Sequence, residues 1–197
     1  MHTAFKEWGV IVDALGAGEQ ILILRKGGIS EGRGGFKMEH PRFLLFPTLF
    51  HQQREAVIPA AQTRYDLIAP GFAPPDTLRL EYFAEVVMAE KLNSLADAQA
   101  LRGQHVWRDE VIAERFDWGS DKGIFALAVR VFRLAQSIEL PMLPAYGGCK
   151  SWIVLEQEIA TDGSQSVLTD AAFEKKLTAL RSALDRNFTP QTENLSA

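Results

Sequence analysis

Residues 123–134 have the sequence GIFALAVRVFRL, and this stretch decides the class of fold. Its apolar side chains occupy both odd and even positions, which is typical of a strand buried on both faces of a sheet. Two more strand-like runs lie on either side of it, over residues 78–89 and 151–156. The sequence therefore predicts a sheet with this stretch as a central strand.

The first 69 residues predict an α-β-β-α unit. Ala4, Trp8, Ile11 and Leu15 recur at helical spacing, so we expect a helix there. Short apolar runs bounded by glycine or proline follow, and then a helical pattern in which Pro59 should cause a kink or a break. The expected elements are a helix over 3–15, strands over 20–25 and 42–46, and a helix over 51–65.

The remainder of the chain alternates strands and helices without a regular rhythm. Ser94 and Asp97 form a capping-box pattern at the start of a short helix, and a second helical stretch covers 107–115. Asp170 caps a final helix with one apolar stripe. We therefore predict an α+β fold with a small mixed or barrel-like sheet and a C-terminal helix, in preference to a doubly wound sheet.

A proline-rich segment over residues 70–75 is the candidate linker. It divides the chain into an N-terminal α/β subdomain over 1–69 and a C-terminal α+β subdomain over 76–189, with one continuous domain as the alternative. The polar residues 190–197 are expected to form a frayed tail.

Composition describes an ordinary globular protein. The 197 residues are 47% hydrophobic and 23% charged, which is enough to bury a sizeable core. No apolar run reaches the roughly 18 residues of a membrane helix, and the N-terminus lacks a signal-peptide pattern, so we expect a cytoplasmic protein without membrane contact. The single cysteine, Cys149, excludes an internal disulfide.

The formal net charge of −4 conceals an uneven distribution. Residues 21–64 hold seven basic against three acidic side chains, and residues 122–152 hold four against one. The intervening residues 81–121 hold four basic against nine acidic side chains. Separately solvated faces would explain this pattern, and so would one anion site that both basic segments share.

Each basic segment carries a cation beside a pair of glycines. Glycines let backbone N–H groups approach a ligand closely, and neighbouring cations favour an anionic one. An ordinary glycine-rich connection is the competing explanation. The predicted anion-binding residues are Arg25, Lys26, Gly27 and Gly28 in the first segment, and Gly147, Gly148, Lys150 and Ser151 in the second, where Trp152 or Tyr146 offers a ring for stacking.

Three other side chains are candidates for chemistry. His51, in a first helical turn, is a speculative acid or base, with capping or packing as the alternative. Arg130 is a further predicted anion-binding residue, because an arginine in an apolar strand needs an anion, with a structural carboxylate such as Glu81 or Glu85 as the alternative. Lys150 could activate Cys149 as a nucleophile, although a lone cysteine is more often a small packed side chain.

The sequence resembles a bacterial and cyanobacterial family known as domain of unknown function 1802 (DUF1802). The resemblance covers nearly the whole chain and is carried by LRKGGI over 24–29, by FPT with HQ over 46–52, and by YGGCKSW over 146–152. It implies no established activity, but a restriction or defence context. Residues 83–152 also resemble PUA-like barrels, a fold analogy that implies recognition of bases.

We expect a nucleic-acid- or nucleotide-associated module with one phosphate-binding pocket. One alternative is an enzyme that acts on a small anionic substrate with His51 as acid or base, and a second is a protein-interaction module. Because no ligand triad is recognisable, we expect no metal site, and we expect no cofactor. The sequence makes no prediction of an oligomeric state.

Overall fold

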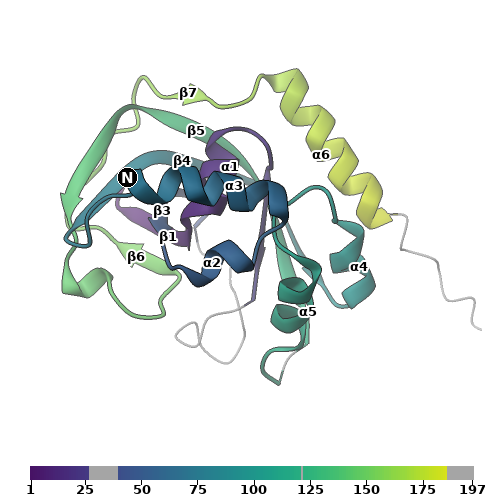
Figure 1. The fold of residues 1–197 in the computed structure, drawn as a ribbon. Helices are drawn as coiled ribbons and strands as arrows, with labels where there is room; N and C mark the ends of the chain where they lie inside the picture. Colours follow the sequence, from purple (N-terminus) through teal and green to yellow (C-terminus); the bar gives the residue numbers. More distant parts are fainter. Residues whose placement is uncertain (27–39, 121, 186–197) are drawn as a thin grey trace, which may run out of the picture.

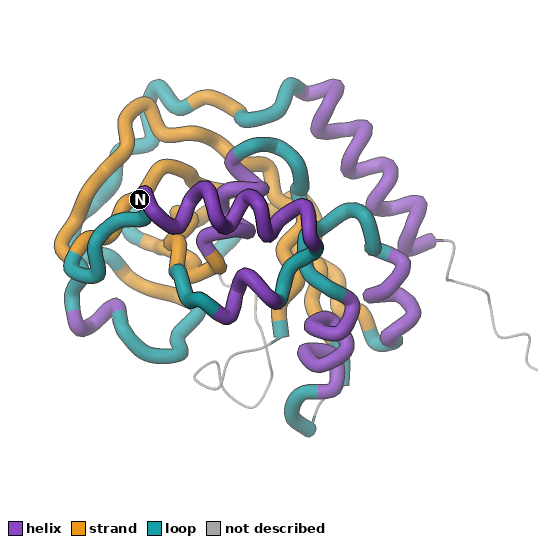
Figure 2. The backbone as a smooth tube through the Cα atoms, in the orientation of Figure 1, coloured by secondary structure: helices purple, strands orange, loops and turns teal. Residues whose placement is uncertain are grey.

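A mixed β-sheet runs through the centre of the molecule and helices border it (Figures 1 and 2). The computed structural model describes residues 1–26, 40–120 and 122–185. The strands are β1 (Thr3–Trp8), β2 (Leu22–Arg25), β3 (Arg42–Thr48), β4 (Thr77–Leu92), β5 (Ile124–Pro141), β6 (Trp152–Val154) and β7 (Gln165–Ser166). The helices are α1 (Gly9–Gly16), α2 (Gln52–Glu55), α3 (Pro59–Ile68), α4 (Leu95–Ala100), α5 (Asp109–Asp117) and α6 (Asp170–Asp185), with short 3-10 turns η1 (Ala69–Gly71) and η2 (Pro144–Tyr146).

The sheet order is β2-β5-β4-β3-β1-β6, and β7 pairs with β5 outside this path. Strands β1 and β3 are parallel, whereas the other pairs among the described strands are antiparallel. The long strands β4 and β5 pair along almost their whole length, with register shifts between Leu80 and Tyr82 and between Val86 and Met88. The α+β class, the mixed sheet and the C-terminal helix are confirmed.

Both faces of the sheet are buried, which explains the continuous apolar runs. In β3, Phe43 and Leu45 belong to one core cluster, while Leu44 and Phe46 belong to a second. Successive side chains of a strand point to opposite faces, so the two clusters lie on opposite sides of the sheet. The first cluster also includes the buried hydrophobic residues of α1 and α6.

The N-terminus differs from the prediction. The expected helix over residues 3–15 is a strand, β1, followed by the helix α1. The helical spacing of Ala4 and Trp8 was misleading because β1 is paired on both edges, by β3 and by β6. These partners lie far away in the sequence, so local periodicity does not reveal them.

Two other local predictions are confirmed. The helical pattern over 51–65 is interrupted, and Pro59 is the first residue of α3. Proline is favoured at this position because its missing N–H has no partner within the first helical turn. At the start of α4, the Ser94 hydroxyl accepts a hydrogen bond from the backbone N–H of Asp97 over 3.1 Å.

The single sheet contains strands from both sides of residues 70–75. The division into two subdomains stays a prediction. None of the helices among the described residues is long and apolar enough to cross a membrane.

Candidate functional site

The end of β2 contacts the start of β6. Nη2 of Arg25 donates a 2.7 Å hydrogen bond to Oγ of Ser151, and the guanidinium carbon of Arg25 lies 5.0 Å from the centre of the Phe5 ring. Ser151 is buried, whereas Arg25 is partly exposed. The structure thus joins one residue from each basic segment, although 126 positions separate them.

Aromatic rings surround this contact. The ring centre of Trp152 lies 4.7 Å from that of Phe5, 5.2 Å from that of Phe43 and 5.1 Å from that of His40. Pairing between β1 and β6 produces this arrangement, since Phe5 is the cross-strand partner of Trp152. We call these residues together the Arg25 cluster: Phe5, Arg25, His40, Phe43, Ser151 and Trp152.

The glycine turn before β6 is held by a lysine of β1. The ammonium of Lys6 donates to the carbonyl of Gly148 over 3.1 Å, and the N–H of Gly147 donates to the carbonyl of Pro144. Burial lowers the pKa of Lys6; the neighbouring Cys149 raises it, and the charge of Lys150 lowers it further. The Gly147 N–H is therefore already hydrogen-bonded within the turn. Cys149 and Lys150, which follow it, are exposed.

Lys26 has a structural role among the described residues. Its ammonium donates to the carbonyls of Phe116 and Gly123, each over 3.0 Å. These hydrogen bonds connect the end of β2 to the end of α5 and to the residue before β5. The predicted ligand residues Gly27 and Gly28 lie outside the described residues.

A second group of side chains, none of them among the predicted site residues, lies beside the Arg25 cluster. Nη1 of Arg115 donates to the carbonyl of Leu24 over 3.1 Å. The guanidinium carbon lies 4.7 Å from the ring centre of Trp8 and 5.2 Å from that of Trp107. Burial lowers the pKa of Arg115 to about 10; the carboxylate of Glu7 opposes this effect, and the charge of Arg25 adds to it.

Glu7 is the acidic member of this group and is only 1% exposed. One carboxylate oxygen accepts a 2.7 Å hydrogen bond from the N–H of Trp8, whereas Oε2 has no hydrogen-bond partner among the described residues. Nε of Arg25 and Nε1 of Trp107 are also buried without a partner in the described part of the chain. Most buried polar atoms in folded proteins are paired, so these three mark an unusual region.

Arg130 lies apart from the Arg25 cluster. Phe125 is the β5 residue that pairs with Arg25, and Arg130 follows five positions later, about 16 Å away at the usual rise of a strand. Its guanidinium forms an ion pair with Asp170 and lies 5.2 Å from the ring centre of Phe173. Neither Glu81 nor Glu85, the partners suggested by the sequence, forms an ion pair with Arg130.

His51 is exposed at the N-terminus of α2, a helix of four residues. Within the described parts of the chain, its imidazole accepts or donates no hydrogen bond and shares no ion pair. In the part of the chain that the structure describes, His51 thus has no partner that would orient it as an acid or base. Among the described residues, no group of three His, Cys, Asp or Glu side chains could hold a metal ion.

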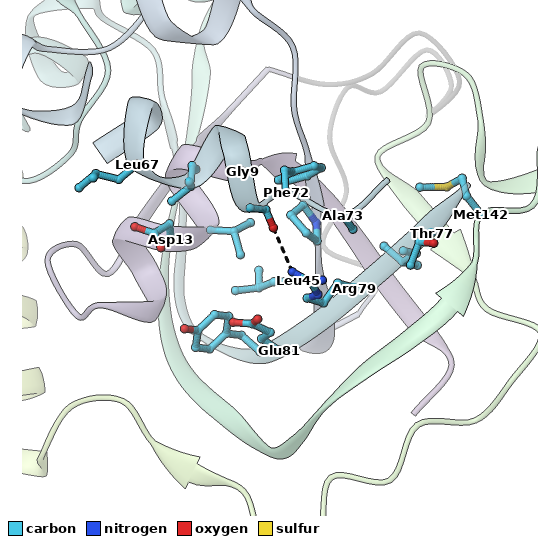
Figure 3. Close-up of a pocket in the computed structure, with 16 residues that line it drawn as sticks. Gly9, Asp13, Leu45, Leu67, Phe72, Ala73, Thr77, Arg79, Glu81 and Met142 are labelled. Atoms are coloured by element: carbon cyan, nitrogen blue, oxygen red, sulfur yellow. Dashed lines mark hydrogen bonds between the residues drawn. The ribbon is translucent and has the colours of Figure 1, made fainter. Parts of the chain in front are cut away.

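The pocket drawn in Figure 3 contains none of the predicted site residues. It has a volume of about 250 Å³ and lies between α1, the α3–η1 segment and the start of β4. Its lining is mainly apolar, with Asp13, Arg79 and Glu81 as its charged side chains.

These observations define an α+β protein with a mixed sheet and a cluster of arginine, serine and aromatic side chains where β2 meets β6. The family model described as a domain of unknown function, DUF1802, matches residues 4–179, so the chain belongs to that family. None of the curated proteins matches this chain.

The solved structures similar to this chain include crystal structures of ASCH from Zymomonas mobilis. One is 12% identical with a TM-score of 0.43, covering 90% of this chain and 94% of the other. A mutant form is also 12% identical with a TM-score of 0.42, covering 90% of this chain and 96% of the other. At these TM-scores the likeness carries no inference about what this chain binds.

Proposed function

We propose that this chain is a nucleic-acid-associated module that binds a nucleotide unit at the Arg25 cluster. In this proposal a base stacks against the partly exposed ring of Trp152, and Arg25 and Lys150 contact phosphate. The observation that carries the proposal is the hydrogen bond between Arg25 and Ser151, which holds a cation beside an aromatic ring.

The chemistry of the cluster supports this ligand class. Aromatic rings stack on any base, and arginine binds phosphate through several donors in one plane. The Ser151 hydroxyl engages one guanidinium nitrogen of Arg25, and the side chain of Arg25 is partly exposed. Lys6 and the exposed Lys150 add positive charge near the cluster, in a protein whose net charge is −4.

The direct test is the affinity for fluorescent single-stranded RNA and DNA oligonucleotides at several salt concentrations. A ligand phosphate that displaces counterions gives a negative slope of log affinity against log salt. We expect Lys150→Gln to reduce that slope by about one, and Arg25→Gln to weaken binding and reduce the slope similarly.

Arg181→Gln is the matched control, because it removes one positive charge from an exposed site on α6. Its slope should equal that of the unmodified protein. Thermal unfolding of each variant checks that the fold is kept. An absence of binding at low salt, or equal losses in Lys150→Gln and Arg181→Gln, would contradict the proposal.

A further inference from the structure

The pocket in Figure 3 is a second site, separate from the Arg25 cluster. Helix α1 supplies Val12, the α3–η1 segment supplies Leu67 and Ile68, and the strands supply Leu45 and Leu78. Its volume of about 250 Å³ is slightly below the common range of small-molecule pockets. Ligand pockets typically combine such apolar walls with a few placed polar groups, and these polar groups determine the class of ligand.

Two of the three charged side chains in the lining already have partners. Arg79 donates from Nε to Glu139 over 3.0 Å and from Nη1 to the carbonyl of Gly71 over 3.1 Å, the latter drawn in Figure 3. Asp13 forms an ion pair with Arg64. The positive charge of Arg79 is therefore balanced by a carboxylate that lies outside the pocket lining.

Glu81 is the charged side chain of the lining without a partner. Within the described residues it shares no ion pair or hydrogen bond, and it is partly buried. Arg64, which faces Asp13, also forms an ion pair with Glu19, so one cation serves two carboxylates there. The pocket consequently carries an excess of negative charge.

The pKa of Tyr82 also reflects the negative charge in the pocket. Its side chain lines the pocket, and burial raises the pKa of its hydroxyl. The charges of both Glu81 and Asp13 raise this pKa further, while Arg133 lowers it. The two carboxylates therefore act on the same region of the pocket, and Figure 3 shows both at the end away from Met142.

We propose that this pocket binds a small organic cation, with an apolar body against the leucine and isoleucine walls and an ammonium group beside Glu81. An ammonium would give Glu81 the partner that it lacks. A carboxylate or phosphate in the same place would instead face Glu81 and Asp13, and like charges at short range repel.

The test compares three probes of similar shape: 2-phenylethylammonium, 2-phenylethanol and 3-phenylpropanoate. Binding is followed by titration with ¹³C-methyl methionine NMR, since Met142 lines the pocket. We expect the ammonium probe to shift the Met142 signal and to bind about tenfold more tightly than the alcohol, and the carboxylate probe to bind least.

Glu81→Gln should remove the preference for the ammonium probe over the alcohol. Glu85→Gln is the matched control, because it lies on the same strand but forms an ion pair with Arg42 instead of lining the pocket. Its preference should stay unchanged. Ala73→Phe, which fills the pocket without changing its charge, should block all three probes.

The proposal would be overturned by binding of none of the probes, by a preference for the alcohol or the carboxylate, or by an unchanged preference in Glu81→Gln. Lys150→Gln should leave probe binding intact. This result would separate the pocket from the proposed nucleotide site, whose test uses different ligands and variants.

Discussion

Arg115 illustrates how this protein accommodates charge next to its core. Its guanidinium lies between the rings of Trp8 and Trp107 and donates to a backbone carbonyl of β2. Contacts of a cation with ring faces partly replace lost hydration. Arg115 therefore connects α5 to β2 immediately next to Arg25, so the position of the candidate site depends on a residue outside it.

His105 makes stability depend on pH. It is buried, and burial lowers its pKa from 6.5 to about 4, an effect that Asp109 only partly opposes. The unfolded chain therefore binds a proton below about pH 6.5 that the folded protein does not bind. We expect the free energy of unfolding to fall by about 2 to 3 kcal/mol between pH 7 and pH 4.5.

Urea unfolding at several pH values in this window measures the effect. His105→Gln cannot titrate, so its free energy of unfolding should change much less over the same range, whatever its absolute value. Asp109 and Glu110, whose pKa values are lowered by arginine partners and backbone contacts, affect stability mainly at lower pH. An equal pH dependence in both proteins would exclude His105 as the cause.

Single residues also show what the sequence could predict. The basic–glycine pattern selected Arg25 and Ser151, and the structure brings these two residues into contact, while their role in binding an anion stays a prediction. Arg130 was predicted to bind a ligand anion, with Glu81 or Glu85 as the alternative partners, and its ion pair is instead with Asp170 from α6. The choice among acids depends on how a helix packs on the sheet, and Glu85, directly opposite in the strand register, pairs with Arg42 instead.

At the scale of elements, α1 packs tightly against β4. A Cβ atom added at Gly16, the last residue of α1, would lie 2.3 Å from Cζ of Tyr82 and 2.7 Å from its hydroxyl oxygen. Tyr82 is only 8% exposed, and its ring stacks against Arg133. The tyrosine ring therefore has little room to move away.

We expect Gly16→Ala to destabilise the protein by about 1 to 3 kcal/mol, because overpacking forces neighbouring groups to shift. Gly71→Ala is the control, since nothing lies within 4 Å of a Cβ at that position. Its effect should stay within about 0.5 kcal/mol. Chemical denaturation compares the two, and similar losses in both variants would contradict the packing explanation.

Elements with a local signature were predictable, and elements defined by distant partners were not. Ser94 and Pro59 act through contacts within a few residues: the helix after Ser94 begins as expected, and Pro59 interrupts the helical pattern over 51–65 as expected. β1 has no such signature. Its apolar spacing fits a helix equally well, and only β3 and β6 make it a strand.

For the whole molecule, α6 completes the main core. Phe173, Leu177 and Leu180 are at most 4% exposed and belong to the same core cluster as α1 and β2. Burial of three such side chains contributes about 5 to 9 kcal/mol, which is comparable with the total stability of many domains.

A chain that ends at Thr169 is therefore expected to lose cooperative unfolding. A chain that ends at Thr189 should unfold at the same urea concentration as the full chain, since the sequence predicts a frayed tail over 190–197. Circular dichroism during urea titration distinguishes these outcomes. Unchanged unfolding of the chain that ends at Thr169 would show that the stability of the fold does not depend on α6.

The position of β1 between β3 and β6 has a consequence for biosynthesis. Ala4 pairs with Leu44 and with Ile153, which follow it by 40 and 149 residues. At about 5 to 20 residues per second, translation leaves the second edge of this strand without its partner for about 7 to 30 s. During this interval the nascent chain must therefore keep the unpaired edge of β1 from pairing with other chains.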